Sequence, residues 1–592
     1  MRIQLKIISI LLTLHCGQLL TAQVRISSEE ELELLREIPM EYVYIHTPGT
    51  LYMPGEYLYY SLYCINTQNY RLSELSEVAY LQLIGEDNTV VFTQKIDLEK
   101  GRGQGDYFFP TDLPSGNYKL VAFTHWMKNA GLAQFFSADV TFLNPYRSDQ
   151  SVFLNPENNR AECTNSKDSG FEDGGQNTPS RDLGLQLEKT VYKTGEMIRL
   201  QLKNFRGSRG YGNYSLSVRK ADDLQALTPV RSTEFATYSL EFLKHIPQRV
   251  NDILAIPEQR GELISGRVTT SEGTALEDRW IAISLPGADF QVKKVRTDEE
   301  GKFYTYLTRP YRDRMGMAVL VSPGMENVDF EWYTPYDFEG TIPCFYNFQL
   351  KPDQAGVIRQ RSIHNQIENS YFEVKPDTLQ EVVPVDPFEG EIPEVYQLDD
   401  YTRFTTLEET LVEFIEYVWV KRGEDGEASF WVREPMTPWG PDYTTDPPLV
   451  VVDGILVPNH NSLLGYDARK IKTIKVLRDK YQLGGANYQG MVVIETIDAT
   501  FLENWDTPLG TRFSFLPPSP EKNYFRQMEG SENIPDFRYQ LLWEPEISIQ
   551  GEGKSYSFYT SQVPGQYEIR LEGYTTYGKP ISLSTTFQVE SQ

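Results

Sequence analysis

Apolar and polar side chains alternate along most of this sequence, and glycine and proline interrupt the alternation at short intervals. Tyrosine and phenylalanine, with 37 and 30 copies, fill many of the apolar positions. A period of two places successive side chains on opposite faces of a β-strand, and aromatic residues favour strands. The pattern therefore predicts a mainly β protein made of tandem β-sandwiches and excludes a purely helical bundle. At ordinary domain sizes the 592 residues correspond to roughly three to five domains.

A turn motif that occurs twice indicates a repeated domain. Tyr52-Met53-Pro54-Gly55-Glu56 returns as Tyr192-Lys193-Thr194-Gly195-Glu196, and an alternating run follows each copy. The glycine permits the positive φ of a turn, and the alternation after it is typical of a half-buried strand. We therefore predict two sandwiches of one kind, over residues 41–147 and 183–257, joined by a polar linker over 148–182.

The second half of the sequence indicates three further domains. Alternating runs predict a sandwich over 261–345, followed by an acidic, proline-rich linker over 351–400. Residues 401–500 begin with a capping box, Thr406-Leu407-Glu408-Glu409, and continue with three apolar strands. That order predicts a small α+β domain. Alternation then predicts a last sandwich over 501–592.

The first residues have the composition of a secretory signal peptide. Arg2 and Lys6 precede an apolar run over 7–14, and small residues follow it up to Ala22. The run is too short to cross a bilayer, which disfavours the alternative of a membrane anchor, and we predict a signal peptide over 1–22. No later stretch is apolar for long enough to form a transmembrane helix. We therefore expect an exported protein.

Charge and cysteine content narrow the classes of partner. The 83 acidic and 56 basic residues give a net charge of −27, which repels phosphate backbones and excludes DNA or RNA as an expected partner. After removal of the signal peptide three cysteines remain, Cys64, Cys163 and Cys344. One disulfide among them is compatible with export, but their spacing matches no metal site and does not show whether any pair is bonded.

No motif in the sequence predicts a catalytic, cofactor or metal site. Gly551-Glu552-Gly553-Lys554-Ser555 ends like a phosphate-binding loop, but an alternating run follows it where such a loop needs a helix. There is no Gly-x-Ser-x-Gly elbow and no His-Glu-x-x-His helix. We therefore expect no enzyme activity. An unrecognised pair of carboxylates remains the alternative, because a chain this acidic offers many pairs.

Two groups of motifs resemble known modules. Tyr52-x-Pro54-Gly55-Glu56, with the later Leu113-Pro114-Ser115-Gly116-Asn117-Tyr118, resembles the macroglobulin MG2-type domain, and 183–257 resembles its neighbour in that array. Residues 261–345 are similar to the carboxypeptidase regulatory-like domain, a small transthyretin-like sandwich. These resemblances imply β-sandwich folds.

The most specific resemblance lies in 401–500. Its runs are Pro448-Leu449-Val450-Val451-Val452-Asp453-Gly454, Ile471-Lys472-Thr473-Ile474-Lys475-Val476-Leu477 and Gly490-Met491-Val492-Val493-Ile494-Glu495-Thr496. They resemble the plug domain of TonB-dependent outer-membrane transporters, in the version found in Bacteroidota. The resemblance makes five residues candidates for a structural or interaction role in a plug-like domain: Asp453, Gly454, Tyr481, Gly484 and Gly490.

Departures from these families shape the expected function. A transporter barrel of about 22 strands, each roughly 10 residues long, needs more chain than the 95 residues that follow Ile497. The Cys-Gly-Glu-Gln thioester sequence of macroglobulins is also absent. We therefore expect a non-enzymatic scaffold or accessory protein, in the periplasm or at the outer membrane, with the cell surface as an alternative location. It would dock on an outer-membrane protein or lipoprotein complex, such as a TonB-dependent transport or outer-membrane assembly system.

Two other functions remain open. The aromatic content of 13% suggests carbohydrate binding at the cell surface, because exposed aromatic rings can stack on sugars. The same rings more often fill sandwich cores. The macroglobulin resemblance also allows a protein that contacts proteases without a thioester.

Overall fold

The computed structural model describes most of the chain after the predicted signal peptide. The described residues are 23–26, 28–154, 181–224, 227–239, 246, 248–250, 252–287, 289–308, 311, 315–321, 327–335, 342, 344–381, 386–423, 426–435, 446–527 and 534–591. The predicted signal peptide and most of the predicted linker over 148–182 lie outside these residues.

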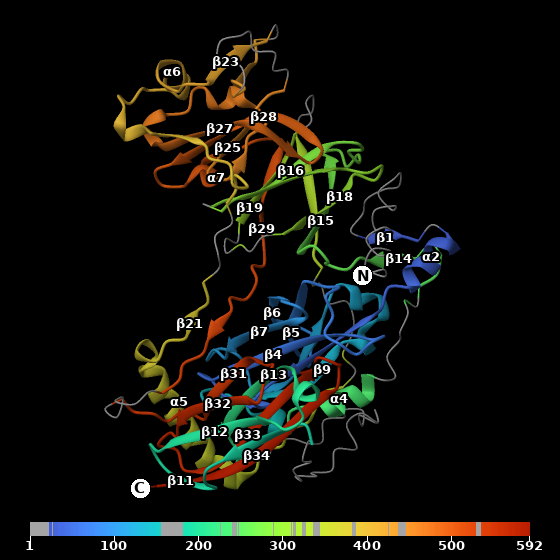
Figure 1. The fold of residues 1–592 in the computed structure, drawn as a ribbon, viewed down its shortest axis with the longest axis vertical. Helices are drawn as coiled ribbons and strands as arrows, with labels where there is room; N and C mark the ends of the chain where they lie inside the picture. Colours follow the sequence, from blue (N-terminus) through green and yellow to red (C-terminus); the bar gives the residue numbers. More distant parts are fainter. Residues whose placement is uncertain are drawn as a thin grey trace. The chain divides into compact units, whose positions relative to one another are not determined.

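The chain divides into two compact units, each assembled from separated segments. Unit 1 comprises Met1–Val24, Arg260–Pro335 and Val382–Pro518. Unit 2 comprises Arg25–Gln259, Tyr336–Glu381 and Ser519–Gln592. Both consist mainly of β-sheets (Figure 1), which confirms the predicted mainly β fold with tandem sandwiches.

The first sandwich of unit 2 has the two layers that the alternation indicates. One sheet has the order β2-β4-β7 and the other β3-β9-β8-β5-β6. The strands are β2 (Glu41–His46), β3 (Leu51–Tyr52), β4 (Tyr57–Asn66), β5 (Val78–Gly85), β6 (Val90–Asp97), β7 (Arg102–Phe108), β8 (Gly116–Phe123) and β9 (Phe136–Phe142). Tyr52, Leu58, Tyr60 and Leu83 are fully buried between the layers, so the turn motif and the strand after it lie in a hydrophobic core.

The second sandwich of unit 2 is composite, and it corrects the predicted domain boundaries. Its sheets have the orders β10-β12-β32 and β11-β34-β33-β13-β31. The strands are β10 (Leu183–Leu187), β11 (Val191–Lys193), β12 (Met197–Asn204), β13 (Gly212–Lys220), β31 (Gln540–Ile549), β32 (Gly553–Tyr559), β33 (Gly565–Thr575) and β34 (Pro580–Glu590).

The predictions of separate sandwiches over 183–257 and 501–592 are therefore wrong. Strand β12 pairs antiparallel with β32, and β13 lies between β31 and β33. Ile198 and Phe558 are opposite one another in that register and belong to one core. The four early strands cannot cover both faces of a two-layer core, and the C-terminal strands complete it.

The predicted linker over 351–400 contains the longest helix of the described chain. Helix α5 (Ala355–Ser370) has 16 residues, and its Ile358 packs in a core cluster with Leu51, Met53 and Phe348. Thus 351–381 belongs to the packed body of unit 2 rather than to a linker. The other regular elements of this unit are α2 (Glu29–Arg36), α3 (Ser151–Leu154), α4 (Ser232–Ser239), β14 (Ile253–Ala255), β21 (Thr378–Leu379) and β30 (Lys522–Asn523).

Unit 1 contains one sandwich and one α+β module. The sandwich has the sheets β18-β15-β20 and β17-β16-β19-β29. Its strands are β15 (Glu262–Thr270), β16 (Trp280–Leu285), β17 (Gln291–Arg296), β18 (Lys302–Leu307), β19 (Met315–Leu320), β20 (Val328–Tyr333) and β29 (Gly510–Ser514). Because β29 pairs with β19, the start of the predicted C-terminal sandwich belongs here, and Phe513 and Phe515 join this core.

The α+β module, residues 386–504, is built on a five-stranded sheet with the order β22-β27-β28-β25-β26. Its elements are β22 (Glu394–Gln397), α6 (Leu407–Glu413), β23 (Val418–Arg422), β24 (Ala428–Val432), β25 (Leu449–Val452), β26 (Ile455–Leu456), β27 (Ile471–Leu483), β28 (Ala486–Thr496) and α7 (Phe501–Asn504). The predicted capping box is present at α6, where Thr406 and Glu409 exchange hydrogen bonds. Strand β25 pairs parallel with β28, so its buried run Leu449–Val452 lies in the middle of the module.

Two further features bear on the predictions of export and membrane attachment. Cys64 is a free, buried thiol, whereas Cys344 is disulfide-bonded. Among the helices of the described residues, none combines the length and the apolar composition needed to cross a bilayer.

Candidate functional site

Three of the five residues singled out in the α+β module form its tight turns. Asp453 and Gly454 have φ values of 48° and 85° and join the paired residues Val452 and Ile455. Two positive φ angles between paired residues form the tight hairpin turn that strand twist favours. Gly484 (φ 58°), with Gly485 (φ 79°), forms the equivalent turn between β27 and β28. The structure therefore has a tight turn at each of these two dipeptides.

The other two candidates lie near the β27–β28 hairpin end. Gly490 has a φ of 81°, and a Cβ there would lie 2.5 Å from the carbonyl oxygen of Leu477. It lies next to the irregular register between Leu477 and Lys480. Tyr481 is paired with Tyr488 and packs against a cluster of buried side chains that includes Leu477 and Met491. Both positions are explained by chain geometry and packing.

Asp453 also anchors the turn through its carboxylate. Its oxygens accept hydrogen bonds from the Thr496 N–H (2.7 Å), the Thr496 hydroxyl (2.5 Å) and the Phe501 N–H (3.1 Å). We expect Asp453→Ala to lower the free energy of unfolding by about 1–3 kcal/mol, because two backbone donors lose their acceptor. Chemical denaturation of the full chain measures this, with Asp479→Ala, an exposed residue of β27, as the matched control. An equal effect of both substitutions would show that the carboxylate has no anchoring role.

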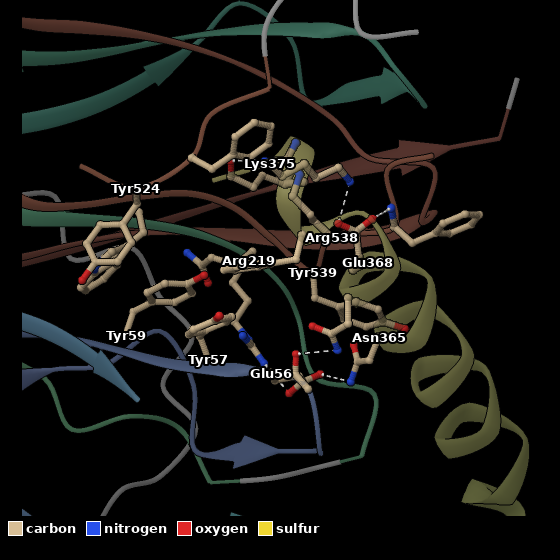
Figure 2. A pocket seen from close by; sticks show the side chains of 18 of the residues that line it. Glu56, Tyr57, Tyr59, Arg219, Asn365, Glu368, Lys375, Tyr524, Arg538 and Tyr539 are labelled. Atoms are coloured by element: carbon tan, nitrogen blue, oxygen red, sulfur yellow. Dashed lines mark hydrogen bonds and ion pairs between the residues drawn. The ribbon is translucent and has the colours of Figure 1, made fainter. Parts of the chain in front are cut away.

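A second site lies in unit 2 and was not foreseen from the sequence. It is a cavity of about 140 Å³ between β4, β31, helix α5 and the segment around Tyr524. Figure 2 shows Tyr57, Tyr59 and Tyr524 grouped on one side and α5, with Asn365 and Glu368, on the other. The lining also includes Glu56, Arg219, Phe372, Lys375, Asp377, Phe525, Phe537, Arg538, Tyr539 and Trp543.

At one end of the cavity, a buried ion-pair network fixes helix α5 to the first sandwich. Arg361 binds both oxygens of Glu56, with Nε–Oε1 and Nη2–Oε2 distances of 2.7 and 2.8 Å. Asn365 donates to Glu56 Oε1 at 3.1 Å, and Arg219 lies 3.6 Å from Oε2. Burial by itself would raise the pKa of Glu56, but the charge and hydrogen bonds of Arg361 outweigh it and hold that pKa below its ordinary value.

A second network closes the other end. Lys375 Nζ lies 2.7 Å from Glu368 Oε2, and Arg538 Nε lies 2.7 Å from Asp536 Oδ1. The second oxygen of Glu368 accepts from the Phe537 N–H. The Glu56 carboxylate is therefore paired with Arg361, and the Glu368 carboxylate is paired with Lys375. Neither is placed as a general base.

Two tyrosines of the aromatic wall present hydroxyls without a hydrogen-bond partner among the described residues, whereas the Tyr524 hydroxyl donates to Asp106 Oδ2 at 3.2 Å. The rings of Tyr57 and Tyr59 are nearly parallel, with centroids 5.7 Å apart, and Tyr524 meets Tyr59 edge-on at 5.1 Å. Burial, together with the charges of Asp106 and Asp377, raises the pKa of Tyr57 to about 12, so its hydroxyl stays protonated at neutral pH. Burial likewise raises the pKa of Tyr59. Within the described part of the chain, neither hydroxyl has a hydrogen-bond partner, and the buried Trp543 indole N–H also lacks one.

Asp377 is the lining carboxylate without an ion pair; burial and then the charge of Asp106 raise its pKa, and one oxygen accepts from the Phe525 N–H at 2.9 Å. No histidine or cysteine lines the cavity. The described residues contain no group of three His, Cys, Asp or Glu side chains that could hold a metal ion.

Comparison with known proteins identifies no family. No protein-family model matches the sequence, and no curated protein matches it. Among solved structures, α-2-macroglobulin from Salmonella reacted with methylamine is similar at 9% identity, with 93% of this chain and 39% of that chain covered and a TM-score of 0.23. Trypsin-activated α-2-macroglobulin from Escherichia coli is similar at 10% identity, with 95% and 42% covered and a TM-score of 0.22.

A third structure covers less of this chain. The Yersinia pseudotuberculosis adhesin InvE is similar at 9% identity over 49% of this chain and 58% of that chain, with a TM-score of 0.13. The chain thus spans about two fifths of the length of the macroglobulins that it matches. At such TM-scores these similarities support no inference about function.

Proposed function

We propose that this chain is a non-enzymatic scaffold of the bacterial envelope that docks on an outer-membrane protein or lipoprotein complex through its α+β module. The supporting observation is an open sheet edge. Strand β22 has β27 on one side and no neighbouring strand on the other within the described part of the chain. An open edge presents backbone donors and acceptors that a partner strand can pair with.

The two edges of this sheet differ in a way that supports docking at β22. The opposite edge, β26, is short and buried, and Ser284 of the neighbouring sandwich accepts a hydrogen bond from the Leu456 N–H at 3.1 Å. At β22, Val395 is 50% exposed and the preceding Ile392 is 91% exposed. Exposed apolar side chains beside unpaired backbone groups promote aggregation of a free protein. In a protein that binds a partner, the same groups can be buried and paired in the interface.

The plug-like resemblance supports the choice of partner. The sequence motifs of the module resemble those of a plug domain, and a transporter barrel is the surface that a plug domain normally meets. TonB-dependent transport and outer-membrane assembly systems are therefore the partners that we propose, with the protein exported to the periplasm or held at the outer membrane.

Affinity purification from detergent-solubilised envelopes tests this proposal. The wild-type chain should retain an outer-membrane protein, and Ile392→Asp with Val395→Asp should reduce its recovery at least about tenfold, because both charges would be buried in the contact. Val412→Asp with Met315→Asp, at positions 69% and 40% exposed in the same unit, is the matched control. Undiminished recovery with the β22 variant would refute docking at this edge.

A second function, saccharide binding in the cavity of unit 2, is favoured by the Tyr57–Tyr59 pair. Parallel rings with unpartnered hydroxyls can stack on a sugar ring and donate to its oxygens. We expect Tyr59→Ala to abolish binding of any glycan that the wild-type chain selects from a glycan array, while Tyr401→Ala, at an exposed position outside the cavity, leaves binding intact. Glycan binding that survives Tyr59→Ala would place the site elsewhere.

A further inference from the structure

A groove in unit 2 is lined by several basic side chains, although acidic residues outnumber basic ones in the whole chain. It has a volume of about 960 Å³. Five of its lining residues are basic: Arg181, Arg206, Arg209, Arg231 and Lys579. Asp182 is the acidic residue among its lining. This local excess of positive charge contrasts with the net charge of −27 for the whole chain.

The groove is built on the composite sandwich, which fixes the positions of its walls. Arg206 and Arg209 lie in the β12–β13 connection, and Lys579 lies in the β33–β34 turn. The Thr576 N–H donates to the Tyr211 carbonyl oxygen at 2.8 Å, which joins the two connections. Arg231 directly precedes helix α4, and Arg181 lies two residues before β10. Four separate segments therefore bring their cations to one place.

Three of the five cations form no ion pair within the described part of the chain. Lys579 is paired with Asp182, and Arg231 Nε lies 3.9 Å from Glu234 Oε1. Arg181, Arg206 and Arg209 form no ion pair with a described residue, but the charges of Arg206 and Arg209 help to lower the pKa of Asp182, after the larger effect of its hydrogen bond with Lys579. All three are exposed. Neighbouring guanidinium groups repel one another, so an anion between them relieves an unfavourable arrangement.

We infer that this groove binds a small ligand that carries several phosphate or sulfate groups. The guanidinium fork matches the oxygens of such groups in a bidentate manner. Ser208 and Thr233 add hydroxyl donors to the lining, and Tyr577, which is 58% exposed, adds an aromatic surface. The volume lies at the upper end of the range of small-ligand sites. The anionic groups could belong to a soluble molecule or to a lipid headgroup, since both present the same chemistry.

Isothermal titration of the full chain with inositol hexakisphosphate tests the inference. We expect saturable binding that weakens at least about tenfold in Arg206→Glu with Arg209→Glu, because two charge-assisted contacts become repulsive. Arg199→Glu with Arg359→Glu makes the same change in net charge at exposed positions outside the groove, and it should leave the affinity within about twofold of the wild type. Arg206→Gln with Arg209→Gln, which removes charge without reversing it, should have an intermediate affinity.

Flotation with phosphatidylglycerol vesicles distinguishes the two sources of the anion. Flotation of the wild type that the Arg206→Glu, Arg209→Glu variant loses would support a lipid headgroup. Hexakisphosphate binding without flotation would support a soluble ligand. Absence of saturable hexakisphosphate binding together with absence of flotation would overturn the inference. Equal losses in the groove variant and the control variant would overturn it too, because they would show a general effect of net charge.

Discussion

Replacing Arg361 by alanine is expected to lower the free energy of opening of helix α5 by about 3–5 kcal/mol. The side chains of Arg361 and Glu56 are only 4% and 7% exposed. Removing the guanidinium leaves the Glu56 carboxylate buried, with the Met53 N–H, Asn365 and the more distant Arg219 as its remaining partners. An uncompensated buried charge costs more than the loss of an exposed pair.

Hydrogen–deuterium exchange of the α5 amides in the full chain measures this effect, because it reports local opening without requiring the whole protein to unfold in one step. Arg359→Ala is the control: it changes the same residue type in the same helix at an exposed position and should shift the opening free energy by less than about 0.5 kcal/mol. Slow exchange of α5 in the Arg361→Ala variant would contradict the proposed anchoring role.

The same ion pair predicts a pH dependence of defined sign. The pKa of Glu56 is lowered in the folded protein, so the stabilisation is fully present above the ordinary glutamate pKa and is lost as the pH falls through the lower folded value. Protection of α5 in the wild type should therefore decrease below about pH 4. The Arg361→Ala variant should lack this part of the acid response.

A chain that ends at Arg538 is expected to lose the fold of residues 183–220. The truncation removes β31 to β34, which pair with β11, β12 and β13 and provide more than half of the buried residues in the core of the composite sandwich. Ile198, Leu200 and Leu216 would lose their buried environment. The four strands that remain, with fewer than half of the core residues, cannot retain a stable two-layer structure.

Limited proteolysis with mass spectrometry tests the truncation. Residues 183–220 should be cleaved rapidly, whereas the described sheets of unit 1, which contain none of the removed strands, should stay protected. Addition of the separate 539–592 segment should restore protection. Protection of 183–220 in the truncated chain alone would instead show that the early strands form an independent sandwich, as the sequence suggested.

The strands were predictable because their periodicity is local, but their partners were not. Alternation at Ile198, Leu200 and Leu202 indicates which face is buried, and all three are buried. It does not indicate that the neighbouring strand begins at Gly553. A period of two specifies a face, whereas strand pairing depends on matching surfaces far apart in the sequence. The composite sandwich was missed for this reason.

Helix α5 escaped prediction because it buries polar side chains. Arg361, Ser362, His364 and Asn365 are buried alongside Ile358, so no apolar stripe marks the helix. The cavity beside it was missed with it. The pair Tyr57 and Tyr59 gave the one local signal, two aromatic residues on the same face of a predicted strand. In contrast, the turn positions Gly454 and Gly484 were predictable because positive φ values favour glycine.

Site-specific photo-crosslinking in living cells tests the central claim most directly. A photoreactive amino acid is placed at Val395 on β22, and in a second strain at Ile363, which is 49% exposed on α5. The proposed docking predicts an adduct between position 395 and one outer-membrane protein, and little or no such adduct from position 363. No envelope adduct from position 395, or the same adduct in equal yield from both positions, would contradict the account.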